Sequence, residues 1–241
     1  DVPTIESALD AFSEWPDLIL FDSALRRDAL GRFSFLTADP FRTFTIEQPQ
    51  YGLDPFDEIR NVLSRSEFQV ESIEGLPPFQ GGLAGLLSYE LGGCFERLPA
   101  SPWNEFQMPA LQAGLFDWAL AWDHDQNRAW VICHGFGDRL GSGRRLKSVL
   151  GQLSKPATAD PQSVPTLRRK AGIDGTLKVA PQFPLQGCPG VTSDFSREDY
   201  IRNVERVREY IYAGDIFQAN LSQRLLIESD DSPIEIYKRL R

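Results

Sequence analysis

Apolar residues recur every three to four positions in three separate stretches of the chain, residues 4–13, 142–153 and 196–214. This spacing places the apolar side chains on one face of a helix, so each stretch is predicted to be an amphipathic helix. The apolar faces consist of Ile5, Ala8, Leu9 and Phe12 in the first helix, Leu146, Val149, Leu150 and Leu153 in the second, and Tyr200, Val204, Val207 and Ile211 in the third.

Capping residues mark helix ends in the last quarter of the chain. Ser196 is followed three residues later by Asp199, as in a capping box, and Gly214 stands where a left-handed C-terminal cap is needed. Ser232 and Glu235, with a proline directly after the serine, predict the start of one more helix.

A short helix is also predicted after Asp54. Asp54 is a suitable N-cap, and Pro55 suits the first helical position because it has no amide hydrogen to lose. Phe56, Ile59 and Leu63 are then expected to face the core.

Extended patterns predict strands at 18–21, 32–37 and 41–46. Residues 216–228 alternate between apolar and polar positions, so we expect a long strand with one polar face. Its apolar side is expected to lack partners within this chain. The apolar side comprises Phe217, Ala219, Leu221, Leu225 and Ile227, and the polar side comprises Gln218, Asn220, Ser222 and Arg224.

The clearest hairpin joins residues 115–122 to residues 128–135. Alternating large apolar residues in both halves predict two antiparallel strands connected by the polar turn 123–127. Trp118, Trp122 and Trp130 are expected to form the core of this hairpin.

Strands and helices therefore alternate without a fixed repeat. The expected fold class is α+β (mixed α/β), with packed, largely antiparallel sheets and outer helices. Six prolines fall within 154–190, and a structureless loop of that length is unusual inside a domain. We therefore predict an N-terminal region at 1–153, a Pro-rich linker at 154–191 and the start of a second domain at 192–241.

Composition narrows the classes of function. Twenty-five basic residues against 34 acidic ones give a net charge of −9, which argues against a nucleic-acid partner or an anionic membrane surface. The sequence has no long apolar run and no signal peptide. The three cysteines form no CxxC pair, which together with the missing signal leads us to expect a cytoplasmic protein.

The last predicted helix carries Ile236, Tyr237 and Leu240 and then meets the chain end at Arg241. Its apolar face is unmatched in the sequence, and the chain starts at Asp1 rather than at a methionine. We expect the chain to be part of a longer protein.

Catalytic motifs are scarce in this chain. The sequence has no P-loop, no nucleophile elbow and no HExxH zinc motif. Glycines within 79–93 are expected to let strands pack closely rather than to bind phosphate, because no lysine accompanies them. His124 and His134 are expected to be hydrogen-bonded structural residues.

Three segments together resemble one family, the chorismate-utilising enzymes. They are PPFQGGLAGLLSYELGGCFERLP (77–99), LQAGLFDWALAWDH (111–124) and SREDYIRNVERVREYIYAGDIFQANLSQRL (196–225). The third segment is typical of the whole family. The first two are most similar to the branch of aminodeoxychorismate synthase component I, the large subunit of para-aminobenzoate synthase.

The resemblance implies an enzyme of folate biosynthesis that replaces the C4 hydroxyl of chorismate with ammonia from a glutamine amidotransferase subunit (component II). It also implies Mg²⁺ as cofactor, held by ligands outside this chain, so no catalytic residue is assigned and the 241 residues alone are expected to be inactive. Two alternatives stay open: anthranilate synthase component I of tryptophan biosynthesis, and a non-catalytic ligand-binding module.

The resemblance further implies a tryptophan-type effector pocket in the N-terminal half. Its motif is a strand that ends in a serine, followed by an Arg-aromatic step. The matching residues are Ser23, Leu30, Gly31, Arg32 and Phe33, with Asp22 where anthranilate synthases usually carry a glutamate. That difference favours the aminodeoxychorismate branch. In the alternative interpretation, Ser23 only ends a strand and Arg32 is a surface charge.

Overall fold

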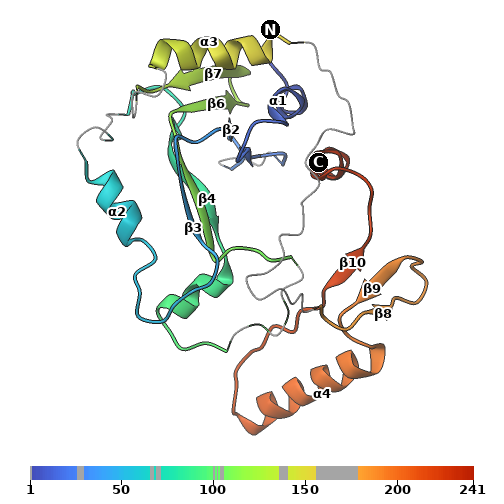
Figure 1. Cartoon of the computed structure of the whole chain (residues 1–241). Coiled ribbons are helices and arrows are strands. Elements are labelled where there is room, and N and C mark those ends of the chain that lie inside the picture. The colour runs from blue at the N-terminus through green and yellow to red at the C-terminus, as the bar shows by residue number, and fades with distance from the viewer. Residues whose placement is uncertain are drawn as a thin grey trace. The chain divides into compact units, whose positions relative to one another are not determined.

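In the computed structural model, the chain forms two compact units (Figure 1). Unit 1 comprises Asp1–Ala100, Met108–Arg168 and Ser232–Arg241, and unit 2 comprises Ser101–Gln107 and Arg169–Asp231. The structure describes residues 2–25, 30–65, 68, 72–99, 101, 103, 106–135, 141–155 and 179–241.

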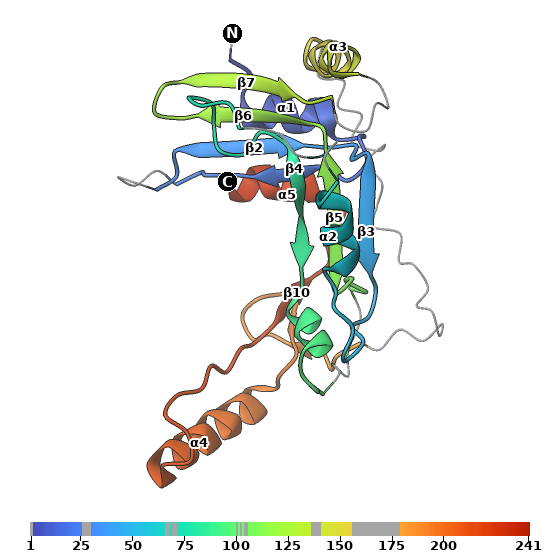
Figure 2. The same ribbon diagram turned by 90° about the vertical axis from the view of Figure 1, so that its left-hand side faces the viewer.

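The first sheet of unit 1 has the strand order β1-β2-β6-β7, and every neighbouring pair is antiparallel. Helix α3 lies along β7, and α1 packs against α3 (Figure 2). These elements confirm the predicted N-terminal helix, the first two strands, the hairpin and the helix at 142–153. Their bounds are α1 Ile5–Phe12, β1 Ile19–Phe21, β2 Phe33–Thr37, β6 Trp118–Asp123, β7 Arg128–Cys133 and α3 Ser142–Leu153.

The second sheet of unit 1 has the order β3-β5-β4 and is also antiparallel throughout. Gly85 allows its close strand packing, because a Cβ atom there would lie 2.2 Å from the carbonyl oxygen of Gln112. The expected role of the glycines is thus confirmed at this position. The bounds are β3 Arg42–Ile46, α2 Asp57–Leu63, β4 Gly82–Leu87, the 3₁₀ helix η2 Tyr89–Cys94 and β5 Leu111–Phe116.

Asp117 separates the two sheets. The run 115–122, predicted as one strand, is divided at this residue: β5 ends at Phe116 in the second sheet and β6 begins at Trp118 in the first. Alternation of apolar residues continues across the break, which is why the sequence pattern does not show it. The prediction of a single strand was therefore wrong, whereas the hairpin β6–β7 is confirmed.

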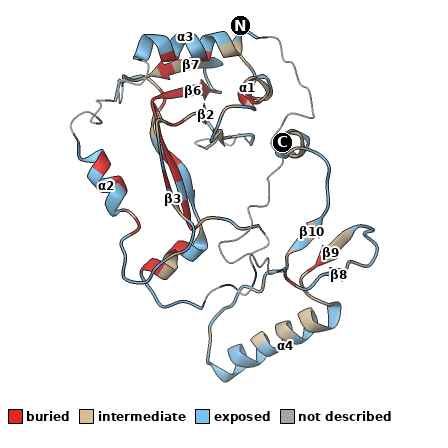
Figure 3. Ribbon diagram, viewed as in Figure 1, coloured by how far each residue is buried: buried red, intermediate tan, exposed pale blue. Residues whose placement is uncertain are grey.

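Each sheet of unit 1 has its own apolar core (Figure 3). The first core surrounds Trp118 and Trp122, both buried as predicted. It is built from Ile5, Ala8, Leu9, Phe12, Leu36, Ala38, Trp118, Leu120, Trp122 and Val149. The second is built from Phe44, Ile59, Val62, Leu91, Cys94, Ala110, Leu111, Ala113 and Leu115.

Helix α2 starts later than predicted. It begins at Asp57 with Phe56 as its N-cap, and Pro55 lies before it. Asp54 instead accepts a hydrogen bond from the backbone amide of Phe56 and pairs with Arg60. Ile59 is buried as predicted, but Val62 rather than Leu63 enters the core, and Leu63 is 37% exposed.

A buried arginine ties α3 to the junction between the sheets. Arg145, only 3% exposed, donates from Nε to Asp117 Oδ2 (3.0 Å) and from Nη1 to Asp39 Oδ2 (2.7 Å). Two carboxylates therefore balance the buried guanidinium, as burial of a charge requires. The predicted buried face of α3 comprised only apolar residues. Of those, Leu146 and Leu150 are 37% and 45% exposed.

Unit 2 contains a small antiparallel sheet of order β10-β9-β8 and the helix α4. Ser196 caps α4 through the amide of Asp199, and Gly214 ends it in the left-handed conformation, as predicted. The bounds are β8 Phe183–Pro184, β9 Val191–Ser193, α4 Arg197–Ala213 and β10 Leu225–Ile227.

The long strand predicted at 216–228 is shortened to β10, so that prediction was wrong in length. Only Leu225–Ile227 pair with a neighbour, namely β9. Among the described residues, 216–224 belong to no strand ladder, although the backbone oxygen of Arg224 accepts from the amide of Asp194 (3.1 Å). Phe217 is 95% exposed, in line with the expectation that this apolar side lacks a core.

Helix α5 (Pro233–Leu240) has the complete capping box expected from Ser232 and Glu235. The prediction that its apolar face is unmatched was wrong, because Ile234 and Tyr237 pack against the first core of unit 1. That contact joins residues more than 200 positions apart, which no local pattern reveals. Leu240 remains 82% exposed.

The proposed domain limits stay predictions. Residues 156–178 of the predicted linker lie outside the described residues. The described part of that linker includes β8 and Ala180, which is 4% exposed.

Candidate functional site

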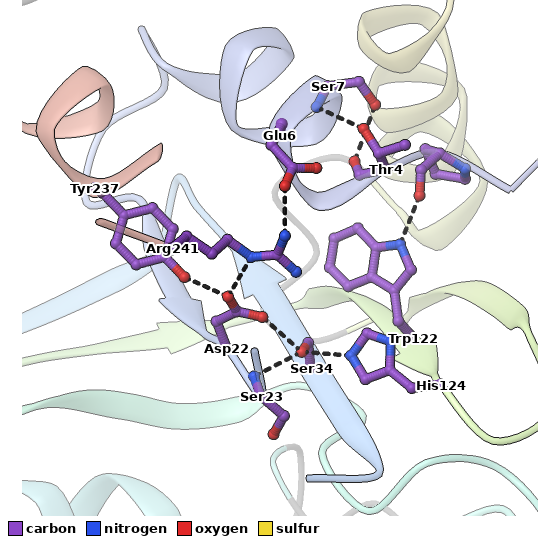
Figure 4. A network of polar contacts seen from close by, with 11 residues as sticks. Thr4, Glu6, Ser7, Asp22, Ser23, Ser34, Trp122, His124, Tyr237 and Arg241 are labelled. Carbon is purple, nitrogen blue, oxygen red and sulfur yellow. Dashed lines mark hydrogen bonds and ion pairs between the residues drawn. The ribbon is translucent and has the colours of Figure 1, made fainter. Parts of the chain in front are cut away.

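A cluster of polar side chains lies where β1 ends beside β2 (Figure 4). We call it the Asp22 cluster; it comprises Asp22, Ser23, Ser34, His124, Tyr237 and Arg241. Asp22 and Ser23 follow β1, Ser34 lies in β2, and His124 directly follows β6. Tyr237 belongs to α5, and Arg241 is its C-cap. The cluster therefore joins the beginning, the middle and the last residues of unit 1.

Ser34 is the centre of the cluster and is completely buried. Its hydroxyl donates to Asp22 Oδ1 (3.0 Å) and accepts from the backbone amide of Ser23 (2.9 Å). His124 Nε2 lies 2.7 Å from the same oxygen. A hydroxyl has one hydrogen and two lone pairs, so His124 must donate from Nε2 to the lone pair that remains. His124 therefore carries a hydrogen on Nε2, and its expected hydrogen bonding is confirmed.

Asp22 carries a negative charge inside this cluster, with its side chain only 6% exposed. Burial works against that charge, but hydrogen bonds from Arg241, Tyr237 and Ser34 outweigh it and hold the pKa of Asp22 below its usual value. Arg241 Nε lies 2.6 Å from Oδ2, and the Tyr237 hydroxyl donates to the same oxygen. Burial and this bond raise the pKa of Tyr237 to about 12.

The structure brings together part of the predicted effector pocket. The Ser23 hydroxyl donates to the backbone oxygen of Phe33 (2.7 Å), so the strand-ending serine and the aromatic residue are neighbours. Gly31 has a φ of 82°, a conformation that glycine adopts without strain. Leu30 is 76% exposed and contributes nothing to the cluster.

Arg32 points to a different partner. Its Nη2 lies 2.6 Å from Oδ2 of Asp123, the last residue of β6, and its guanidinium lies over the ring of Phe33. The Arg32 guanidinium and two backbone amides hold the pKa of the buried Asp123 carboxyl below its ordinary value. Arg32 is thus neither a free surface charge nor a member of the Asp22 cluster. Its role in ligand binding stays a prediction.

Sequence reasoning missed four members of the cluster: Ser34, His124, Tyr237 and Arg241. Ser34 had a weak signal, since a serine on the buried side of an apolar strand needs a hydrogen-bond partner. Tyr237 and Arg241 had no signal, because their partner Asp22 is 215 and 219 positions away.

Other candidate groups have structural partners. His134 Nε2 is hydrogen-bonded to the backbone oxygen of Gln80. Burial and the nearby charge of Asp117 raise the pKa of the Cys133 thiol to about 11, which opposes formation of a reactive thiolate. In the described part of the chain, no three His, Cys, Asp or Glu side chains are grouped so that they could hold a metal ion. These residues therefore do not fit a Mg²⁺ site.

The antiparallel sheets and outer helices make this a mixed α/β protein, and its fold is similar to that of anthranilate synthase component I. The crystal structure of anthranilate synthase component I from Streptococcus pneumoniae TIGR4 matches 90% of this chain and 47% of its own, with a TM-score of 0.62 and 23% identity. The chain belongs to the chorismate binding enzyme family, whose model matches residues 19–241. This confirms the resemblance and the predicted fold class.

Relatives carry two different names. Anthranilate synthase component 1 of Acetivibrio thermocellus is 27% identical over 100% of this chain and 49% of its own length. Aminodeoxychorismate synthase component 1 of Escherichia coli (strain K12) is 26% identical over 88% of this chain and 42% of its own. Anthranilate synthase alpha subunit 1, chloroplastic, of Oryza sativa subsp. indica is 32% identical over 80% of this chain and 33% of its own length. The chain spans at most about half the length of these curated relatives.

Among the described helices, none is both long enough and apolar enough to cross a bilayer.

Proposed function

We propose that this chain belongs to an aminodeoxychorismate synthase large subunit, which acts in the formation of para-aminobenzoate for folate. The reaction exchanges the C4 hydroxyl of chorismate for an amino group: a C–N bond forms, the C–O bond breaks, and water leaves. A glutamine amidotransferase subunit supplies the ammonia. The family match over residues 19–241 supports chorismate as the substrate.

The observation that carries the choice of branch is the acid at the end of β1. The chain has Asp22 where the resemblance leads us to expect glutamate in anthranilate synthases. Ser34, Tyr237 and Arg241 hold its carboxylate within unit 1. A carboxylate held in this way is poorly placed for feedback control by tryptophan, which favours the aminodeoxychorismate branch. In this proposal, tryptophan is a weak ligand beside Asp22 and Ser23, not a feedback inhibitor.

Anthranilate synthase component I is the second candidate. It is supported by the Acetivibrio thermocellus relative of that name, which aligns with the whole of this chain. Both candidates use chorismate and ammonia, but anthranilate formation also releases pyruvate. The products therefore distinguish the two.

The test uses the complete reading frame that contains these 241 residues, purified and incubated with chorismate, ammonium and Mg²⁺. We expect 4-amino-4-deoxychorismate by mass spectrometry and no pyruvate in a coupled lactate dehydrogenase assay. Fluorescent anthranilate with an equal amount of pyruvate would establish the second candidate. If neither 4-amino-4-deoxychorismate nor anthranilate forms, a non-catalytic ligand-binding module is the interpretation that remains.

The same assay on the 241 residues alone has its own expected result. We propose that they give no turnover, because the resemblance places the Mg²⁺ ligands and the nucleophile in the other half of the family's chain. Turnover above background would contradict this, and Gln218, Asn220 and Arg224 would be the first residues to substitute.

A further inference from the structure

Within the described residues, the chain of unit 1 crosses between its two sheets twice. The first crossing runs from β2 through residues 38–41 to β3, and the second is the single residue Asp117 between β5 and β6. Because β2 pairs with β6 and β3 pairs with β5, the two crossings lie side by side. Two short, adjacent connections can act as a hinge. We call residues 38–41 and Asp117 the hinge.

Hydrogen bonds join the two crossings to each other. The Thr37 hydroxyl donates to the backbone oxygen of Trp118 (2.7 Å), and Trp118 Nε1 donates to the backbone oxygen of Ala38 (2.8 Å). The amide of Phe41 donates to the backbone oxygen of Leu115 (2.9 Å). These bonds keep the crossings together. A group that sets the angle at the hinge has to contact both crossings from outside them.

Arg145 of α3 makes such a contact. Its Nε donates to Asp117 Oδ2 (3.0 Å), its Nη1 donates to Asp39 Oδ2 (2.7 Å), and its Nη2 donates to the backbone oxygen of Asp39 (3.3 Å). Helix α3 packs along β7, so the guanidinium connects the hinge to the first sheet. The guanidinium is planar and its donors point in fixed directions, which fixes the three acceptors relative to one another.

Asp39 is the residue of the hinge that depends most on these bonds. Its φ of 53° lies in the left-handed region, which residues other than glycine adopt infrequently. Such a conformation persists where the surroundings fix it, and Arg145 binds both the carboxylate and the backbone oxygen of this residue. Without the guanidinium, the carboxylates of Asp39 and Asp117 would also repel each other.

We propose that Arg145 is a positioning residue that sets the angle between the two sheets of unit 1, and that the sheets change their relative orientation when its guanidinium is lost. Each sheet keeps its own strand pairing, because Arg145 belongs to no strand. The angle also determines where the Asp22 cluster lies relative to the second sheet, since Ser34 lies in β2 and His124 directly follows β6. The inference does not depend on the proposed function.

The experiment measures residual dipolar couplings of the backbone amides in both sheets. In the unaltered protein, one alignment tensor should fit both sheets. In Arg145→Lys, the charge remains but a single ammonium group cannot hold three acceptors in one plane. In Arg145→Met/Asp117→Leu, both members of the buried pair are replaced by apolar residues, which removes the need to balance a charge. In each variant we expect the couplings of each sheet to fit a tensor of its own, and the two tensors to differ.

Hydrogen exchange shows whether the sheets themselves are intact, and their central amides should stay protected in both variants. Arg144→Met is the matched control, because Arg144 is the exposed neighbour in the same helix; it should keep one common tensor. One common tensor in either Arg145 variant would overturn the proposal. Loss of protection throughout both sheets in both variants would also overturn it, because Arg145 would then be required for the sheets and not only for their angle.

Discussion

Helices α3 and α4 were predicted from the same kind of amphipathic pattern, yet their surroundings differ. In α3, Val149 and Arg145 are buried against the first sheet of unit 1. In α4, none of the 17 residues is buried, and Val204 and Ile211 are 36% and 40% exposed. The amphipathic pattern thus predicts the helix correctly in both units. Burial depends on what covers the apolar face, and within unit 2 the described residues provide no such cover.

The largest expected effect is at Arg145, and its replacement tests how much the buried face of α3 contributes to stability compared with the exposed face of α4. Arg145→Met removes the guanidinium and leaves the buried Asp117 without its partner. Breaking one side of a buried ion pair costs about 3–5 kcal/mol. Urea denaturation followed by tryptophan fluorescence should show this loss. Arg144→Met, an exposed neighbour in the same helix, should change the free energy of unfolding by less than about 0.5 kcal/mol.

A double variant separates the charge effect from simple loss of packing. Asp117 Oδ1 has no hydrogen-bond partner among the described residues, so the carboxylate is already incompletely satisfied. Arg145→Met/Asp117→Leu should recover part of the lost stability, because both buried charges are then gone. A double variant less stable than Arg145→Met would show that Asp117 contributes beyond its pairing with the arginine.

The second prediction compares matched valines in the two helices. Val149→Ala deletes two buried methyl groups and should cost about 1.5–3 kcal/mol. Val204→Ala should stay within about 0.5 kcal/mol of the unaltered chain, since the side chain is partly exposed. Hydrogen exchange in α3 and α4 measures each cost locally. Equal costs would mean that the face of α4 is covered in solution.

The third and smallest effect is the pH dependence of the Asp22 cluster. The folded pKa of Asp22 is lowered, so its contribution to stability is present above the unfolded pKa of about 4 and is lost as pH falls through the folded value. The pKa of Tyr237 is raised to about 12, so its contribution is present below about pH 10 and is lost as pH rises toward 12.

Asp22→Asn provides the measurement for this prediction. The difference in unfolding free energy between the unaltered chain and Asp22→Asn should be largest between about pH 5 and 9. It should shrink toward pH 3 and above pH 10. A difference that is constant from pH 3 to 7 would show that the charge of Asp22 does not hold α5.

Local chemistry determined what could be predicted from the sequence. Ser196, Gly214 and Ser232 act on backbone groups within a few residues, and the helix ends they predicted are confirmed. Asp117 looked like one polar position in an alternating strand, because periodicity does not reveal which sheet a strand joins. Arg145 carried no signal in the sequence, since its partners Asp39 and Asp117 lie 106 and 28 positions away.

The residues of the candidate site also divide into those assigned from the sequence and those found only in the structure. Ser23, Asp22 and Phe33 were assigned only through the family resemblance, and the structure joins Ser23 to Phe33 by a hydrogen bond. The contacts of Arg32 with Asp123 and of Arg241 with Asp22 required the fold, because they join segments 91 and 219 positions apart. Contacts between distant residues depend on how all the strands pair in the sheets. Local sequence patterns do not determine that pairing.

The return of α5 to unit 1 also has a consequence for the order of events during synthesis. Residues 169–231 of unit 2 are translated before α5, and ribosomes add about 5–20 residues per second. For several seconds, the growing chain therefore holds unit 1 without α5. During that interval Asp22 lacks its arginine, and the acidic face of α1 is bare. The nascent chain thus passes through a stage in which Asp22, Glu6 and Asp10 have not yet received their basic partners from α5.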